Sequence, residues 1–515
     1  MNLTIGIIGK SVEWEIILNQ IGLAFSKVNK VEDLTNFRLL IIIDKDIRFD
    51  KNEFHKFINS GGSILTTANA ANNFFGLSSS KRFVSYTQSA DGIFADIEIC
   101  DIYTSLNISD KANVLEDQSD KAIIYVDKIG KGNIVVLPDK LIECCFKVKT
   151  VRKNFASNYS DRFPNERVSQ VSKSKIFQIV RTSLEYLFHS AGLPFAHLWF
   201  YPNGERTIFN FRIDTDFGTE KEVFDLYEIL DRNEIPGTWF IEVKSKEKWL
   251  SKFSQFQNQE LAYHCYRHRM TKNKIQNELD FEKGRKLLVE NGIKVNGYAA
   301  PYGEWSEDIG ELIEKFEFQY SSEFGYAYDG LPFYPILNNR KSSVLQIPVH
   351  PISTNRLIHA GTDSKNLIKY FSDLMDNKIY NFEPLFFYTH PFEKEYDFFD
   401  QLFQEINKRK MHKTTLAEYS KWWKERLKKN WNMKYENGNL ILDTDNKDES
   451  YFVRVMETTG KEYLAPLISD FGSNNKIELK RIKPNIVEVD YQQLRKYTFK
   501  MFKHDILFKV RKMQQ

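Results

Sequence analysis

The sequence contains few cysteines and no long apolar run. Four cysteines are spaced neither as a CxxC zinc knuckle nor as a disulfide framework, and such sparse use is typical of a reducing compartment: Cys100, Cys144, Cys145 and Cys265. No stretch approaches the ~18 consecutive apolar residues that a transmembrane helix needs. Glu13 and Glu15 interrupt the N-terminal apolar residues, so this end does not match a signal peptide. We expect a cytoplasmic protein without a transmembrane segment.

The chain also lacks a strong charge of either sign. Its 72 Lys and Arg residues nearly balance 69 Asp and Glu residues, for a formal net charge of +3. So small an excess creates no global field that would recruit nucleic acid, and we expect no nucleic-acid partner. The chain has 515 residues and is 42% hydrophobic and 27% charged, which indicates a globular protein of two to four domains. Nothing in the sequence determines the oligomeric state.

Residues 1–149 alternate short apolar strands with helical stretches, the pattern of a small α/β sheet. Strands are predicted over residues 3–8, 39–43 and 64–67, helices over 12–23 and 53–58, and a hairpin over 122–137. The GIIGKS string is not a phosphate-binding loop, because Thr4 stands where that loop requires its first glycine.

The rest of the chain divides into three parts. Residues 150–194 are predicted to be a polar linker followed by a helix over 176–188. Residues 195–428 again alternate strands and helices. From 429 to 515, a hairpin turn signal near Asn437-Gly438 and strand-like alternation over 451–455, 477–479 and 486–489 predict a small β-sandwich.

Three strings in the central part hold metal-binding side chains. Asp214 and Asp216 follow a predicted strand over 208–213, and an α/β barrel carries its active site at that end of its strands. His264 and His268 are four residues apart, which on a helical turn places both imidazoles on one face. One carboxylate with two imidazoles favours zinc or cobalt over magnesium. Each string alone also has a bland interpretation, as turn chemistry or as structural histidines.

Two further strings supply groups for catalysis. The loop after residues 297–300 contains Pro301, Tyr302 and Gly303, and a backbone N–H held there can donate to a developing oxyanion. His390 follows a predicted strand over 386–389, where its imidazole can protonate a leaving amine. Taken singly, the first is equally consistent with a plain loop and the second with a structural histidine.

In this order, the strings IDTD, HCYRH, AAPYG and YTH resemble the motifs of polysaccharide deacetylases of the NodB-homology type, carbohydrate esterase family four and its relatives. The resemblance covers residues 200–425 and implies a distorted (β/α) barrel that removes N-acetyl groups from an amino-sugar glycan. It implies Asp214 as general base, and Asp216, His264 and His268 as ligands of a divalent metal, zinc or cobalt. Tyr302 is then the oxyanion donor and His390 the general acid.

The sequence departs from that family pattern at several positions. Ala299 stands where the third motif has an arginine that tethers the base, so another group must hold Asp214; Arg212, Arg267 and Arg269 are candidates. No fourth motif is found, and Tyr388 replaces the late leucine. Aromatic rings near the motif loops are candidates for stacking on a sugar: Tyr266, Trp305, Tyr326 and Tyr328.

Residues 1–149 are similar to the glutamine-amidotransferase-like fold, a flavodoxin-like α/β arrangement, through the GGSILTT and GKGNIVVLP stretches. Ala68 to Ala70 follow the strand after which that family has its cysteine nucleophile, so the resemblance implies a fold without that activity.

Three hypotheses for the function remain. The first is a metal-dependent carbohydrate N-deacetylase. Ala299 motivates the second, a carbohydrate-binding or scaffold protein that keeps the fold without turnover. The third, a glycosyltransferase using Asp214 and Asp216 with manganese, has no need of the two imidazoles.

Overall fold

The computed structural model describes residues 1–44, 49–89, 92–468, 476–484 and 490–514. The chain forms two compact units, each built from separated segments. The first unit contains residues 1–147, 170–204 and 424–480, and the second contains 148–169, 205–423 and 481–515. The sequence-based division into four consecutive parts stays a prediction. Among the described residues, no helix has both the length and the apolar character needed to cross a bilayer.

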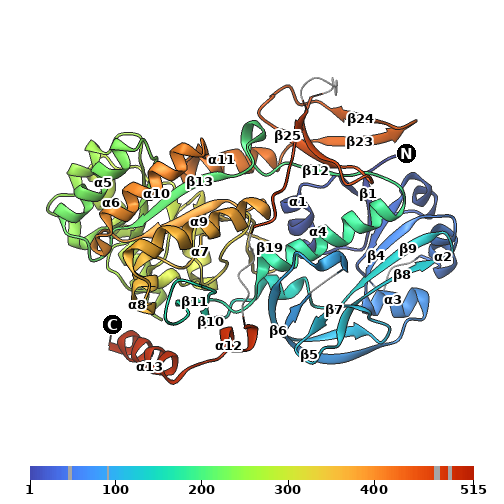
Figure 1. The fold of residues 1–515 in the computed structure, drawn as a ribbon, viewed down its shortest axis with the longest axis horizontal. Coiled ribbons are helices and arrows are strands. Elements are labelled where there is room, and N and C mark those ends of the chain that lie inside the picture. The colour runs from blue at the N-terminus through green and yellow to red at the C-terminus, as the bar shows by residue number, and fades with distance from the viewer. Residues whose placement is uncertain (45–48, 90–91, 469–475, 485–489, 515) are drawn as a thin grey trace. The chain divides into compact units, whose positions relative to one another are not determined.

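The first unit is organised around a nine-stranded mixed sheet with the order β2-β1-β3-β4-β9-β8-β7-β5-β6 (Figure 1). The strands from β2 to β9 in this order are parallel, and the remaining neighbours pair antiparallel. The strands are β1 (Ile5–Ile8), β2 (Phe25–Lys27), β3 (Leu39–Ile42), β4 (Ser63–Thr67), β5 (Ser79–Gln88), β6 (Ile99–Ser109), β7 (Val114–Asp117), β8 (Ala122–Ile129) and β9 (Gly132–Leu137). The helices are α1 (Val12–Ile21), α2 (Lys51–Asn59), α3 (Ala68–Phe75) and α4 (Lys173–Ser190).

A second sheet of this unit combines residues far apart in sequence. Its order is β12 (Phe195–Leu198), β25 (Phe452–Met456), β26 (Glu462–Pro466) and β27 (Ile477–Glu478). β23 (Trp431–Glu436) and β24 (Asn439–Thr444) form a separate hairpin. The β-sandwich predicted for residues 429–515 is not confirmed, because β12 lies outside that range and helices α12 (Tyr491–Leu494) and α13 (Phe499–Gln514) lie within it. The strand predicted over 486–489 falls outside the described residues.

The second unit contains a parallel half-barrel sheet with the order β20-β17-β16-β15-β14-β13-β21, and β22 also pairs with β13. Its strands are β13 (Ile208–Asp214), β14 (Gly237–Glu242), β15 (Glu260–Cys265), β16 (Gly297–Tyr298), β17 (Tyr320–Ser321), β20 (Leu345–Gln346), β21 (Leu385–Thr389) and β22 (His412–Lys413). Its helices include α5 (Glu220–Arg232), α6 (Lys274–Glu290), α7 (Glu307–Lys315), α8 (Thr354–Ala360), α9 (Ser364–Tyr380), α10 (Tyr396–Lys408) and α11 (Leu416–Arg426), and β18 (Ile336–Leu337) and β19 (Arg340–Lys341) form a small hairpin.

The polar segment predicted as a linker forms an antiparallel pair instead. β10 (Thr150–Asn154) pairs with β11 (Asn165–Ser169), and the C-terminal helices α12 and α13 lie beside this pair (Figure 1). Arg152 donates to Asp505 of α13 over 3.0 Å, and the Arg167 guanidinium lies 4.8 Å from the centre of the Phe508 ring. These contacts attach the end of the chain to the second unit.

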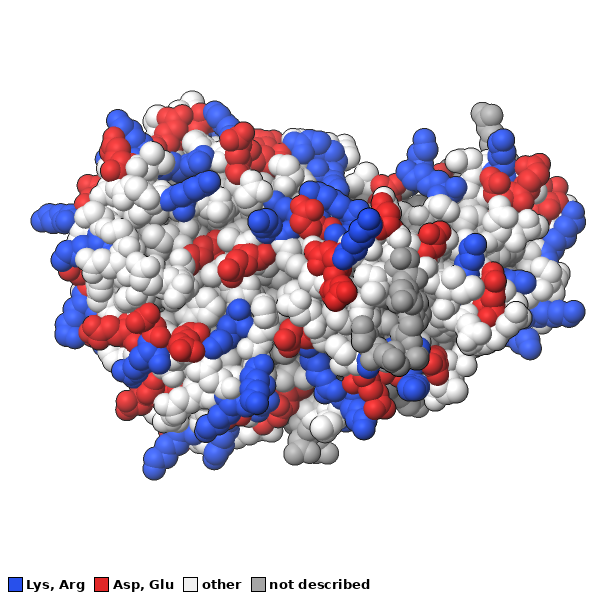
Figure 2. Space-filling model, turned by 90° about the horizontal axis from the view of Figure 1, so that it is seen from above, with Lys and Arg blue, Asp and Glu red and all other residues white. Residues whose placement is uncertain are grey.

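Charges of both signs are interspersed over the described surface that Figure 2 shows. No broad region of one sign covers the described residues on that face, in keeping with the near balance of acidic and basic residues in the sequence.

Candidate metal centre

The site begins with β13, whose side chains alternate between two environments. Successive residues of a strand point to opposite faces of the sheet. On one face, the apolar side chains of Phe209, Phe211 and Ile213 belong to the hydrophobic core of the unit. On the other face, the polar side chains of Asn210, Arg212 and Asp214 are also buried. The polar face ends at the C-terminal end of β13, where Asp216 follows in the loop. The strand therefore brings Arg212, Asp214 and Asp216 into one region.

Three predicted metal ligands converge there. Nε2 of His264 lies 3.5 Å from Oδ1 of Asp216, and Nε2 of His268 lies 3.3 Å from Oδ2 of the same carboxylate. The potential ligand atoms of Asp216, His264 and His268 all lie within 4.8 Å of one another. Asp214, Asp216 and His390 satisfy the same limit. Groups that are up to 176 residues apart in sequence, from Asp214 to His390, thus share one site.

The two histidines reach the site by a different route from the one predicted. His264 belongs to β15, and His268 lies in the bend that follows, so the pair is not on a helical turn. The pairing register between strands β14 and β15 shifts near the end of these two strands, between Ile241 and Glu242. The irregular backbone after β15 returns His268 to the side of His264, and the spacing of four residues serves a bend rather than a helix.

The donor atoms fit a transition metal. Oδ1 of Asp216 and Nε2 of His264 are buried and have no hydrogen-bond partner among the described residues. Nδ1 of His264 lies 2.7 Å from the carbonyl oxygen of Ala299, so this nitrogen donates its proton and Nε2 is left as a ligand. Burial lowers the pKa of His268 to about 4, which favours the neutral imidazole that binds metals. Leaving such buried polar atoms unpaired is costly unless a ligand satisfies them.

Arg212 holds the second carboxylate. Its Nε and its terminal nitrogen each donate to one oxygen of Asp214 over 2.7 Å, and the guanidinium also donates to Ser322. Burial raises the pKa of Asp214, but the charge and hydrogen bonds of Arg212, together with the nearby imidazoles of His264 and His390, outweigh burial, so this pKa lies below its usual range. Arg267, another candidate tether, pairs with Asp280 instead. Arg212 therefore occupies the role left open by Ala299.

His390 faces the same cluster from β21. Its Nε2 lies 3.8 Å from Oδ1 of Asp216, and its Nδ1 lies 2.8 Å from Oε1 of Glu393. Burial lowers the pKa of His390, but the carboxylates of Asp216 and Glu393 outweigh burial and raise it to about 9. Sequence reasoning missed Glu393, although it stands three residues after the histidine, within hydrogen-bonding reach on the short turn Pro391–Glu393.

Tyr302 lies on the neighbouring turn, Pro301–Gly303, with a backbone φ of 60°. This left-handed conformation is uncommon for a residue with a bulky side chain. The centre of its ring lies 4.6 Å from that of His268. A hydrogen bond also anchors the residue just before this turn: the N–H of Ala300 donates to Oε1 of the buried Glu323 over 3.2 Å.

The aromatic ring at the mouth of the site is one that the sequence analysis did not select. Phe217 is 66% exposed, and its ring centre lies 5.0 Å from that of His268. Three of the rings predicted to stack on a sugar, those of Tyr266, Trp305 and Tyr326, are instead buried in the unit. The sequence signal that could have identified Phe217 is its position directly after Asp216, in the loop that follows β13.

Comparison with known proteins gives matches among solved structures. No model of a protein family and no curated protein matches the chain. A putative polysaccharide deacetylase from Mycobacterium smegmatis is 16% identical, with 44% of this chain and 93% of that chain covered and a TM-score of 0.38. A probable polysaccharide deacetylase from Pseudomonas aeruginosa PAO1 is 14% identical, with 43% and 92% covered and a TM-score of 0.38.

A family 4 carbohydrate esterase from Streptomyces lividans is 11% identical, with 41% and 92% covered and a TM-score of 0.27. These three solved structures are described as two polysaccharide deacetylases and one carbohydrate esterase. The amidotransferase-like identity predicted for residues 1–149 is not confirmed by these matches.

Proposed function

We propose that this protein is a metal-dependent hydrolase that removes N-acetyl groups from an amino-sugar glycan or its precursor. The observation that carries the proposal is the convergence of one carboxylate and two imidazoles beside a separate, arginine-held carboxylate. A purely structural cluster has no need of a second carboxylate and a third imidazole, each held by its own partner. Hydrolysis of an amide needs both, one to take a proton and one to return it.

Asp216, His264 and His268 would hold the metal, for which we propose zinc, with cobalt as the alternative. When bound, the ion supplies Lewis-acid activation of a water molecule and of the acetyl carbonyl. The neutral form of His268 suits this role, as does the tautomer of His264 that the carbonyl of Ala299 selects.

The chain's own groups carry the proton transfers. Asp214, kept ionised and oriented by Arg212, accepts the proton of the attacking water. His390, held through Nδ1 by Glu393, returns a proton to the leaving nitrogen. The backbone N–H of Tyr302 donates to the developing oxyanion. Phe217 offers an exposed ring on which a sugar can stack.

The test is release of acetate and free amine from N-acetylglucosamine oligomers by the full chain loaded with zinc or cobalt. We expect turnover by the wild type and a loss of about 100- to 10,000-fold in Asp214→Asn, which keeps all three ligands. Asp231→Asn removes one carboxylate from the exposed end of α5 and should retain full activity. Absence of acetate with every metal, in a protein shown to contain metal, would contradict the proposal.

The same experiment separates the catalytically impaired alternative. A carbohydrate-binding or scaffold protein would bind the oligomer equally well before and after Asp214→Asn, with no turnover in either protein. The bidentate contact of Arg212 with Asp214 favours the enzyme, since it supplies the guanidinium whose absence at Ala299 motivated the alternative. The cytoplasmic location and the amidotransferase-like fold of residues 1–149 stay predictions.

A further inference from the structure

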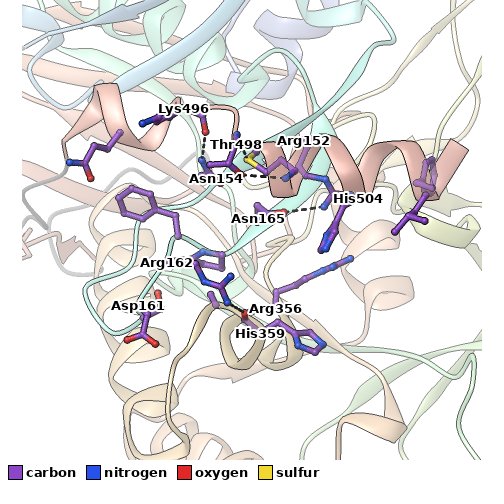
Figure 3. Close-up of a pocket in the computed structure, with 18 of the residues that line it drawn as sticks. Arg152, Asn154, Asp161, Arg162, Asn165, Arg356, His359, Lys496, Thr498 and His504 are labelled. Atoms are coloured by element: carbon purple, nitrogen blue, oxygen red, sulfur yellow. Dashed lines mark hydrogen bonds between the residues drawn. The ribbon is translucent and has the colours of Figure 1, made fainter.

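A cavity of about 1100 Å³ lies in the second unit next to the candidate metal centre. Three segments line it: the β10–β11 pair with its connecting loop, helix α8, and the C-terminal residues from α12 to α13 (Figure 3). Tyr302 also lines it, and the same ring lies 4.6 Å from the ring of His268 and 5.4 Å from that of Phe508. One aromatic ring therefore separates the cavity from a proposed metal ligand.

The charged groups that line the cavity are mostly cationic. Four are basic and one is acidic: Arg152, Arg162, Arg356 and Lys496 against Asp161. In Figure 3, Lys496 and His504 come from the C-terminal segment on one side of the cavity, and Arg356 and His359 come from α8 on the other. Cations thus reach the cavity from opposite walls.

Nearby carboxylates neutralise only part of this charge. Arg152 and Arg167 share the single carboxylate of Asp505, and Arg356 pairs with Glu166 over 2.6 Å. Among the described residues, Arg162 and Lys496 lie within ion-pair distance of no carboxylate. Arg162 donates to the carbonyl oxygen of His359 over 2.9 Å, which fixes the guanidinium at the cavity. The lining therefore keeps an excess of positive charge.

A second observation also indicates a polar ligand. Oγ of Ser160 is buried, belongs to the cavity lining, and has no hydrogen-bond partner among the described residues. A hydroxyl next to a guanidinium is a donor set that suits phosphoryl and carboxylate oxygens. The cavity volume of about 1100 Å³ lies just above the range of about 300–1,000 Å³ for small-molecule sites and is far larger than one oxyanion needs. It has room for a sugar residue that carries the charge.

We propose that this cavity binds an anionic group, phosphoryl or carboxylate, on the sugar whose N-acetyl group reaches the metal centre. The inference rests on the proposed function and names its substrate class: an acidic rather than a neutral amino-sugar glycan. Arg162, Lys496 and Ser160 are the groups that contact the anion. Tyr302, between the two sites, separates the charged group from the reacting acetyl group.

Binding to the full-length, zinc-loaded Asp214→Asn protein tests this without turnover. Calorimetry compares the affinities of N-acetylglucosamine 1-phosphate and N-acetylmuramic acid with that of neutral N-acetylglucosamine. The affinity of inorganic phosphate is measured separately, in the absence of any sugar. We expect at least one charged sugar to bind about tenfold or more tightly than the neutral one, a difference of about 1.4 kcal/mol. The two charged sugars distinguish a phosphoryl from a carboxylate ligand. Equal affinity for all three sugars would overturn the proposal.

Matched double variants identify the groups. Arg162→Gln with Lys496→Gln should abolish the advantage of the charged sugar and leave binding of N-acetylglucosamine unchanged. Lys286→Gln with Lys365→Gln removes the same charge from exposed positions on α6 and α9 and should preserve the advantage. If both pairs reduce it equally, the effect is general electrostatics and the site is refuted. If the advantage persists but no acetate is released from any sugar by the wild type, the deacetylase proposal fails and the anion site stands.

Discussion

Arg212 stands two residues before Asp214, and the alternation of a β-strand places both side chains on the same face. The guanidinium therefore meets the carboxylate without help from another element, and it is fully buried. A buried charge pair is maintained by mutual contact, because either partner alone in a low-dielectric interior is costly. On the function that we propose, the guanidinium that orients the base comes from the strand just before Asp214.

We predict that Arg212→Met lowers kcat of deacetylation by roughly 10- to 100-fold, the range found for groups that orient catalytic residues. The protein should also lose roughly 3–5 kcal/mol of stability, because Asp214 is left buried without its partner. Arg267→Met, which breaks a partly exposed pair with Asp280, is the control and should leave kcat unchanged.

Kinetics at saturating substrate, zinc content and urea unfolding check both effects. Arg212→Lys keeps the charge but not the two parallel hydrogen bonds, so it should recover stability better than kcat. Full activity in Arg212→Met would show that another group holds Asp214.

β15 has different chemistry at its two ends. His264 lies at the C-terminal end near the candidate metal centre, whereas Glu260 begins the strand and is half-buried at the opposite end. Glu260 accepts hydrogen bonds from Thr238, Tyr320 and the N–H of Ala417, and so joins β14, β17 and α11. Burial outweighs these contacts and raises the pKa of Glu260 to about 7. The C-terminal end of β15 thus contributes His264 to the candidate metal centre, whereas its N-terminal end contributes Glu260 to contacts between neighbouring elements.

We predict a pH-dependent contribution of Glu260 to stability. Its pKa is higher in the folded protein than in the unfolded chain, so the folded state binds more protons between about pH 4.5 and 7. The contribution is present below about pH 4.5 and is lost as the pH rises to about 7, by up to about 3 kcal/mol.

Glu260→Gln cannot titrate and should gain stability relative to the wild type between pH 5 and pH 8. Urea unfolding of both proteins at the two pH values measures the difference. Because Glu260 is remote from the metal centre along β15, kcat should not change. A stability difference that is the same at both pH values would disprove the linkage.

Neither compact unit is a continuous piece of chain. The unit with the metal centre takes its barrel from residues 205–423 and adds 148–169 and 481–515 from either side. Those added segments line the cationic cavity, together with α8 and Tyr302 of the barrel. The proposed metal ligands all belong to residues 205–423, whereas the groups that we propose to recognise the anion belong to the two added segments.

We predict that metal binding stabilises this unit, because the ligands converge only in the folded state. A metal that binds the folded form alone adds about 2.7 kcal/mol at a free concentration of 100 times its Kd. Chelation should therefore lower the Tm of one transition in calorimetry, and zinc should restore it. Asp216→Asn should weaken this response strongly, while Asp231→Asn keeps it. A Tm that does not respond to zinc would argue against a metal site.

The sequence by itself determined the two strands that lead to Asp214 and His390. The apolar runs before Asp214 and His390 are strands in the structure, and the ligand types pointed to a transition metal. Such local features can be predicted because the alternation of apolar and polar residues along a short segment indicates a strand.

Tertiary structure decided which groups meet. The bend that returns His268 to His264 and the exposure of Phe217 instead of Tyr266 depend on packing between distant segments. The cationic cavity shows this most clearly, since it joins residues 152 and 504. No local pattern encodes such contacts, because they exist only when the chain is closed around a common core.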